Sequence, residues 1–133
     1  MALNVESITF DTTDPEKAAQ WWAEAAGGQV IPYVPGEFVA VERQPGPKLL
    51  FQKVPDPTPG KNRVHLDFTA ADVDAEVNRL VNLGASETGR HSIGDFGWVV
   101  LADPEGNAFC VLEPRSIYSD TGKKPRTRRL HRR

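Results

Sequence analysis

The 133-residue sequence predicts an α+β fold built from two similar βαβββ modules, at residues 3–57 and 61–115. One observation is the segment 63–68, in which apolar and polar residues alternate as in a half-buried strand. It is followed by Asp72, a good helix N-cap, and then by apolar residues at helical spacing. The other observation is that the same unit occurs 58 positions earlier, in one register without gaps, which indicates an internal duplication.

The first module opens with a strand at residues 7–10. Asp14 then caps a helix that has Pro15 at its first position, where a missing N–H costs nothing. Gly27 and Gly28 end this helix. Three further strands are expected near residues 29–33, 38–41 and 49–52, and a linker rich in proline at residues 54–62.

The second module repeats this order from residue 63 onward. Its helix is expected at residues 73–83, ended by Gly84, and a weak strand near residues 87–91. Two further strands, at residues 97–102 and 108–112, flank Asp103-Pro104-Glu105-Gly106-Asn107, a strong turn sequence. From residue 116 apolar residues become rare, so a basic and disordered tail is expected at residues 116–133.

Composition narrows the class of protein. An apolar fraction of 39% with 26% charged residues is typical of a globular domain, and the sequence shows neither a long apolar run nor a secretion signal. A single cysteine excludes an intramolecular disulfide and suits the reducing cytoplasm. Residues 119–133 hold seven of the basic residues and one acid, which leaves a net charge of −8 on the rest and argues against nucleic-acid binding.

A candidate pocket follows from the polar faces of the predicted strands. In the strands at residues 49–54 and 108–112, one row of side chains faces the helix, and the other row faces the candidate pocket. The 58-residue register pairs Ser7 with His65 and Gln52 with Cys110 on that pocket side. The predicted ligand-binding lining is Ser7, Thr9, Gln52, Arg63, His65, Asp67 and Cys110, with Leu50, Val54, Ala108 and Leu112 as its apolar part.

Several of these residues allow more than one interpretation. His65 can be a metal ligand, a catalytic acid or base, a ligand-binding group or a hydrogen-bonded structural histidine. Cys110 in an apolar strand is more often a small core residue than a nucleophile, and the repeat places no second histidine to activate it. Trp98 can form a stacking wall or belong to the core, and Trp21 can be a partly exposed aromatic residue or a subunit contact.

Taken together, these features resemble the vicinal oxygen chelate superfamily, which includes glyoxalase I, bleomycin- and fosfomycin-resistance proteins and extradiol dioxygenases. The resemblance rests on the tandem βαβββ pattern, the helix starts at Asp14-Pro15 and Asp72, the strand with His65, and the turn at residues 103–107. It is closest to the glyoxalase-like branch. It implies a curved mixed sheet around a central cavity, with the helices on the outer face.

The resemblance also implies where a metal would bind. In metal-dependent members the ligands occupy the positions of Ser7, Gln52, His65 and Cys110, and here only His65 is a strong ligand. In an extended strand the Cβ of Asp67 lies about 7 Å from that of His65, too far for the two to share an ion readily. No metal cofactor is therefore expected, and a divalent metal at His65 is the alternative.

Two classes of function remain. One is a small-molecule binder that holds an apolar or aromatic ligand without a catalytic metal, with His65 as its main polar contact. The alternative is a glyoxalase-type lyase or isomerase that uses His65, with or without a divalent metal. The loss of charged ligands favours the binder. We also expect a homodimer in the cytoplasm, with no specific nucleic-acid or membrane partner.

Overall fold

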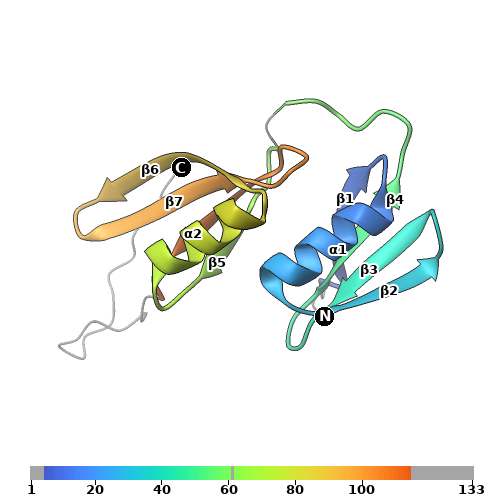
Figure 1. Ribbon diagram of the computed structural model, residues 1–133, viewed down its shortest axis with the longest axis horizontal. Helices are drawn as coiled ribbons and strands as arrows, with labels where there is room; N and C mark the ends of the chain where they lie inside the picture. The colour runs from blue at the N-terminus through green and yellow to red at the C-terminus, as the bar shows by residue number, and fades with distance from the viewer. Residues whose placement is uncertain (1–4, 61, 115–133) are drawn as a thin grey trace, which may run out of the picture. The chain divides into compact units, whose positions relative to one another are not determined.

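The computed structural model describes residues 5–60 and 62–114, so the predicted basic tail lies outside the described residues. The chain divides into two compact units, Met1–Pro59 (unit 1) and Gly60–Arg133 (unit 2), and the division falls inside the predicted linker. Each unit has the element order βαβββ, shown in Figure 1, so the predicted α+β fold with two modules is confirmed. Within the described residues, no helix is both long and apolar enough to span a bilayer.

Unit 1 is a four-stranded mixed sheet with one helix. Strand β1 (Ser7–Thr12) leads into α1 (Pro15–Ala26), which is followed by β2 (Gln29–Val34), β3 (Phe38–Glu42) and β4 (Lys48–Lys53). The strand order is β1-β4-β3-β2, with β1 parallel to β4 and the other pairs antiparallel.

Helix α1 begins and ends where local chemistry predicts. The Asp14 side chain accepts a hydrogen bond from the backbone N–H of Lys17 at 3.2 Å, and Pro15 occupies the first turn. At the other end Gly27 has a φ of 84°, a conformation that favours glycine. The helix packs on one face of the sheet, so Ser7, Thr9 and Gln52 lie on the opposite face, as alternation predicts.

Unit 2 has the same arrangement. Strand β5 (Leu66–Thr69) is followed by α2 (Val73–Leu83), β6 (Ser86–Ile93), β7 (Phe96–Ala102) and β8 (Ala108–Leu112). The strand order is β5-β8-β7-β6, and β5 pairs with β8 in parallel. Phe68 and Phe109 meet edge to face at 5.9 Å, so the odd-numbered residues of β8 form the core-facing row.

The predicted strand at residues 63–68 is shorter in the structure and begins at Leu66. The residues before it form a bend in which Val64 is 77% exposed. Val64 therefore does not belong to the row of apolar side chains that the alternation over residues 63–68 predicts. The side chain of Asn62 explains the bend. Its Nδ2 donates to the carbonyl oxygens of Val64 (2.5 Å) and Ala108 (3.2 Å), and the Ala108 N–H donates to its Oδ1 at 2.7 Å. The Asn62 amide thus takes the place of a strand peptide beside β8.

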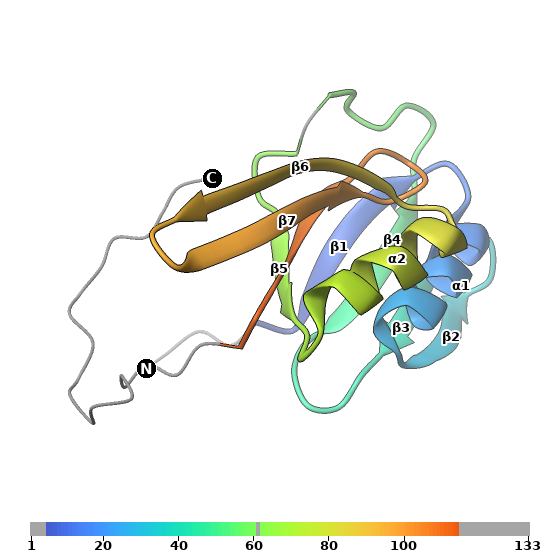
Figure 2. The ribbon, with the colours of Figure 1, turned by 60° about the vertical axis from the view of Figure 1, so that its left-hand side comes forward.

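The two modules do not follow a single 58-residue register. Ile8 pairs with Leu49 in unit 1, and Leu66 pairs with Phe109 in unit 2, so β1 and β5 are related by 58 positions but β4 and β8 by 60. The difference arises in the second hairpin, where β7 has seven residues against five in β3, as the long β6–β7 hairpin of Figure 2 illustrates.

The equivalence of Gln52 with Cys110 is therefore wrong. Cys110 corresponds to Leu50, and Gln52 corresponds to Leu112. A shift of two residues is one full repeat of a strand, so each of these side chains stays on the predicted face of its own sheet.

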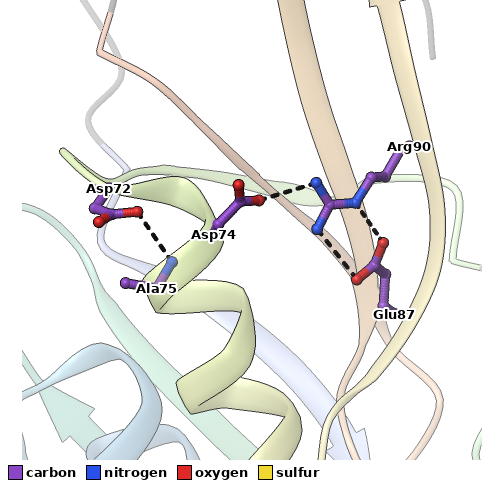
Figure 3. A network of polar contacts seen from close by, with 5 residues as sticks. All are labelled: Asp72, Asp74, Ala75, Glu87 and Arg90. Carbon is purple, nitrogen blue, oxygen red and sulfur yellow. Dashed lines mark hydrogen bonds and ion pairs between the residues drawn. The ribbon is translucent and has the colours of Figure 1, made fainter.

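A polar network joins the first turn of α2 to the edge strand β6 (Figure 3). The guanidinium of Arg90 donates to Asp74 at 3.0 Å through Nη1 and to Glu87 at 2.6 Å through Nε. Asp72 caps the same helix by accepting from the N–H of Ala75 at 3.1 Å. The hydrogen bond from Arg90 lowers the pKa of Glu87, and the two carboxylates raise the pKa of Arg90.

This network predicts a small dependence of stability on pH. Folding lowers the pKa of Glu87, so its ionised carboxylate stabilises the folded protein at a pH above the pKa of the unfolded chain. This stabilisation is lost as the pH falls through the pKa of the folded protein. We expect Glu87→Gln to flatten the acid limb of a plot of unfolding free energy against pH, below the ordinary glutamate pKa of 4.5. The effect should shrink at high salt because the groups are exposed. Denaturant titrations of both proteins test this, and an unchanged acid limb would contradict it.

Candidate functional site

The face of the unit 2 sheet away from α2 carries a pocket of about 430 Å³. Its lining comes from all four strands of this sheet or the residues beside them, and from the turn before β8. The lining residues are His65, Thr88, Gly89, His91, Val100, Ala102, Gly106, Ala108 and Cys110.

Small side chains explain why the sheet is hollow at this place. Val100 pairs with Cys110, and Ala102 pairs with Ala108, so two neighbouring pairs of β7 and β8 form an apolar floor. Three of these four side chains are alanine or cysteine. The row on the other face of β8, by contrast, consists of buried Phe109 and Val111. One strand thus supports the core with its large side chains and leaves space with its small ones.

His91 and Trp98 form one aromatic pair at the β6 side. They are direct partners across the two strands, and their rings stack at 5.5 Å with an interplanar angle of 29°. A Cβ on Gly89 would lie 3.1 Å from Nε2 of His91, so a glycine leaves room for this imidazole. Trp98 shares the alternation of Val100, which places it on the pocket face of β7, although it is almost wholly buried.

His65, Asp67 and Cys110 form a compact cluster at the other side of the sheet. One ring nitrogen, one carboxylate oxygen and the sulfur lie within 4.8 Å of one another. Nε2 of His65 is 3.3 Å from Oδ1 of Asp67. The expectation that His65 and Asp67 can share an ion only with difficulty is therefore wrong. His65 precedes β5, in the bend beside Asn62, and its ring reaches toward Asp67.

The cluster combines different degrees of exposure. The side chains of His65 and Asp67 are 25% and 44% exposed, whereas Cys110 is buried on β8. His65 and Cys110 both line the pocket, and Asp67 lies beside them. Imidazole, carboxylate and thiolate are the three donor types that zinc sites use, so these residues could hold a metal ion.

The other predicted lining residues lie elsewhere. Arg63 is exposed in the bend before β5 and does not line this pocket, and Leu112 is also outside it. Ser7, Thr9 and Gln52 belong to unit 1, on the face of its sheet away from α1. Whether any of these residues binds a ligand stays a prediction.

Sequence reasoning missed the β6 side of the pocket. Thr88, Gly89 and His91 lie on a strand that was expected only as weak and short, near residues 87–91. A usable signal was the turn Gly94-Asp95, because pairing the segments on either side of it brings His91 opposite Trp98.

The tandem βαβββ units are those of the vicinal oxygen chelate class, as the sequence predicted. Residues 7–112 match the family model of the glyoxalase-like domain, and this chain belongs to that family. A search of curated protein sequences gave no match.

Solved structures support the fold assignment. A glyoxalase/bleomycin resistance protein/dioxygenase family enzyme from Burkholderia phytofirmans PsJN is similar with a TM-score of 0.72 at 18% identity, over 84% of this chain and 98% of that one. TnmS3, an antibiotic-binding protein from Streptomyces sp. CB03234, has a TM-score of 0.65 at 25% identity, over 86% and 99%. Lactoylglutathione lyase from Agrobacterium tumefaciens has a TM-score of 0.63 at 19% identity, over 85% and 95%.

Proposed function

We propose that this chain binds an apolar or aromatic small molecule in the pocket of unit 2, and that this binding needs no catalytic metal. The observation that carries the proposal is the pocket itself. Its floor is apolar, with Val100, Ala102, Ala108 and Cys110, and few polar groups surround it. Small-molecule sites typically combine such a floor with a small number of hydrogen-bonding groups that orient the ligand.

The arrangement of the strands suggests a size for the ligand. His65 lies just before β5 and His91 lies on β6, and β5 and β6 are the two edge strands of the sheet. Three strand spacings, about 14 Å, separate the two edges. His91 is level with Leu112 of β8, whereas His65 comes just before Leu66, the partner of Phe109, so the two histidines are also offset along the strands. A flat molecule of two or three fused rings can lie on the apolar floor between the two edges. The antibiotic-binding role named for TnmS3 is consistent with a ligand of this kind.

A binding experiment with variants tests the proposal. The probe is 8-anilinonaphthalene-1-sulfonate, followed by its fluorescence, and binding is confirmed by displacement with unlabelled polycyclic aromatics. Ala102→Phe fills the floor and should abolish binding. His65→Ala should weaken binding by about 0.5–1.5 kcal/mol if the imidazole makes one hydrogen bond to a neutral group.

Val111→Ala is the matched control for this experiment. Val111 lies on β8 between pocket residue Cys110 and Leu112 but is buried on the core face. The substitution should cost stability, about 1 kcal/mol or more, and leave affinity nearly intact. Equal affinities for the unaltered protein, His65→Ala and Ala102→Phe would refute the proposed pocket.

The cluster of His65, Asp67 and Cys110 favours one alternative function. A histidine beside a carboxylate, at the edge of an apolar pocket, can move a proton to or from a bound substrate. A glyoxalase-type lyase or isomerase would use His65 in this way. A glyoxalase-type assay with and without added Zn²⁺ separates the two functions, because only the enzyme gives turnover that His65→Ala removes. The homodimer and the cytoplasmic location stay predictions from the sequence.

A further inference from the structure

We propose that His91 selects the ligand of the unit 2 pocket by binding an anionic oxygen, so that the ligand is a planar aromatic acid with its carboxylate at the β6 side. This ligand class rests on the small-molecule function proposed above and makes it more specific. The sequence predicted His65 as the main polar contact. The surroundings of the two histidines in the structure favour His91 for this role.

The two histidines of the pocket differ in what already holds them. Nε2 of His65 is 3.3 Å from Oδ1 of Asp67, so a carboxylate already engages this imidazole. The ring of His91 stacks on Trp98 at 5.5 Å, and no group within residues 5–60 and 62–114 forms a hydrogen bond or an ion pair with it. Of the described residues that line the pocket, only these two histidines can carry a positive charge. His91 is therefore the group that is available to an anion.

The backbone of β6 turns the imidazole of His91 toward the pocket. The pairing of β6 with β7 shifts by one residue between Glu87 and Gly89, as in a β-bulge, and Thr88 is the extra residue. Its Oγ1 donates to the carbonyl of Val100 at 3.3 Å, and both Thr88 and Gly89 line the pocket. A Cβ on Gly89 would lie 3.1 Å from Nε2 of His91, so the ring leans back along the strand over the glycine. Nε2 thus reaches the level of Val100, the partner of Gly89, in the wall of the pocket.

One row of paired residues crosses the sheet at this level and gives the ligand a direction. Gly89 pairs with Val100, which pairs with Cys110. Cys110 pairs in turn with Asp67 on the far edge strand, three strand spacings or about 14 Å from β6. The Asp67 carboxylate would repel an anion, whereas an N–H of His91 can bind one. The anionic group of the ligand therefore lies at the β6 side, with the aromatic rings on the apolar floor of Val100 and Cys110.

An oxygen acceptor suits this imidazole better than a hydrogen-bond donor does. A neutral imidazole donates through one nitrogen and a protonated imidazole donates through both, so an acceptor can be bound in either state. Hydrogen bonds to a carboxylate are shorter and roughly twice as strong as those between neutral groups. Stacking on Trp98 also restricts rotation of the His91 ring, which lowers the cost of ordering this side chain when a ligand binds. A flat aromatic acid matches both the floor and this wall.

Two probes that differ in charge but hardly in shape test the proposal. The anion 2-naphthoate and the neutral 2-naphthamide carry the same fused rings, and isothermal titration calorimetry measures their affinities for the full-length protein. We expect the unaltered protein to bind 2-naphthoate about tenfold more tightly, because only this probe accepts a charge-assisted hydrogen bond. Equal affinities for the two probes would overturn the proposed ligand class but still support the small-molecule function. Binding of neither probe would refute both.

Phenylalanine substitutions locate the group that binds the anion. His91→Phe keeps a ring that can stack on Trp98 but removes the N–H donors. It should abolish the preference for 2-naphthoate and lower the affinity for 2-naphthamide far less. His65→Phe is the matched control and should retain most of the preference. A preference that survives in His91→Phe, or that is lost only in His65→Phe, would overturn the proposal.

Gly89→Ala tests the placement of the His91 ring without removing the ring. The added methyl group would lie 3.1 Å from Nε2, so the imidazole must move away from its position in the pocket wall. We expect the preference for 2-naphthoate to fall toward that of His91→Phe, while circular dichroism shows that each variant is folded. An unchanged preference in Gly89→Ala would contradict the proposed position of Nε2 over the glycine.

Discussion

Trp22→Ala is expected to destabilise the protein by about 3–5 kcal/mol, the typical cost of removing a large aromatic side chain from a core. Trp22 is 2% exposed on the sheet-facing side of α1. Its ring lies 5.6 Å from that of Phe10, which in turn stacks on Phe51 at 4.9 Å. These three rings join α1 to β1 and β4, so the cavity left by alanine would open at the centre of unit 1. Urea unfolding followed by far-ultraviolet circular dichroism measures the loss.

Trp21→Ala is the matched control for this prediction. Trp21 is the preceding residue on the same helix and touches Trp22 edge to face at 5.0 Å, but it is only partly buried. Removing it should cost clearly less than removing Trp22, because less apolar surface returns to water. Equal losses for the two variants would contradict the placement of the core, and a change in oligomeric state with Trp21→Ala would support the predicted subunit contact instead.

Asp103→Ala is expected to destabilise unit 2 by at least about 2 kcal/mol, because charge-assisted hydrogen bonds contribute roughly 1.5–3 kcal/mol each. Asp103 is buried at 6% exposure, in the turn between β7 and β8. Its carboxylate accepts from the backbone N–H groups of Glu105 (2.9 Å) and Asn107 (2.8 Å), and from Nδ2 of Asn107 (3.0 Å). Alanine would leave these donors without the acceptor that the turn provides.

Two further variants make the Asp103 experiment specific. Asp103→Asn keeps one acceptor oxygen and should recover part of the lost stability. Asp95→Ala removes an exposed carboxylate from the turn between β6 and β7 and should change stability by less than about 0.5 kcal/mol. The same denaturant titration serves for all three. A loss as large for Asp95→Ala as for Asp103→Ala would show that net charge, rather than the hydrogen bonds of the turn, is responsible.

The parts of the fold that depend on local chemistry could be predicted from the sequence. Asp14 and Asp72 cap the two helices as expected, because a cap needs only a short polar side chain and the first turn of the helix. The alternation along β4 and β8 also placed side chains on the correct face of each sheet. This pattern is a property of any strand and does not depend on its partner.

Features that depend on distant residues could not be predicted in this way. The late start of β5 follows from the hydrogen bonds of Asn62 to Ala108, 46 positions away, which alternation does not encode. The register between the modules shifted because β7 is longer than β3, which only the strand pairing reveals. The approach of His65 to Asp67 has the same origin, since it requires the bend that Asn62 stabilises.

The two faces of β8 also have a consequence for how this protein can change. On one face Ala108 and Cys110 determine the space available in the pocket, and on the other Phe109 and Val111 hold the core. Because neighbouring residues point in opposite directions, mutations that change the shape of the pocket and mutations that weaken the core fall on different positions. The pocket of unit 2 can therefore be reshaped through one set of β8 residues while the set that packs the core stays unchanged.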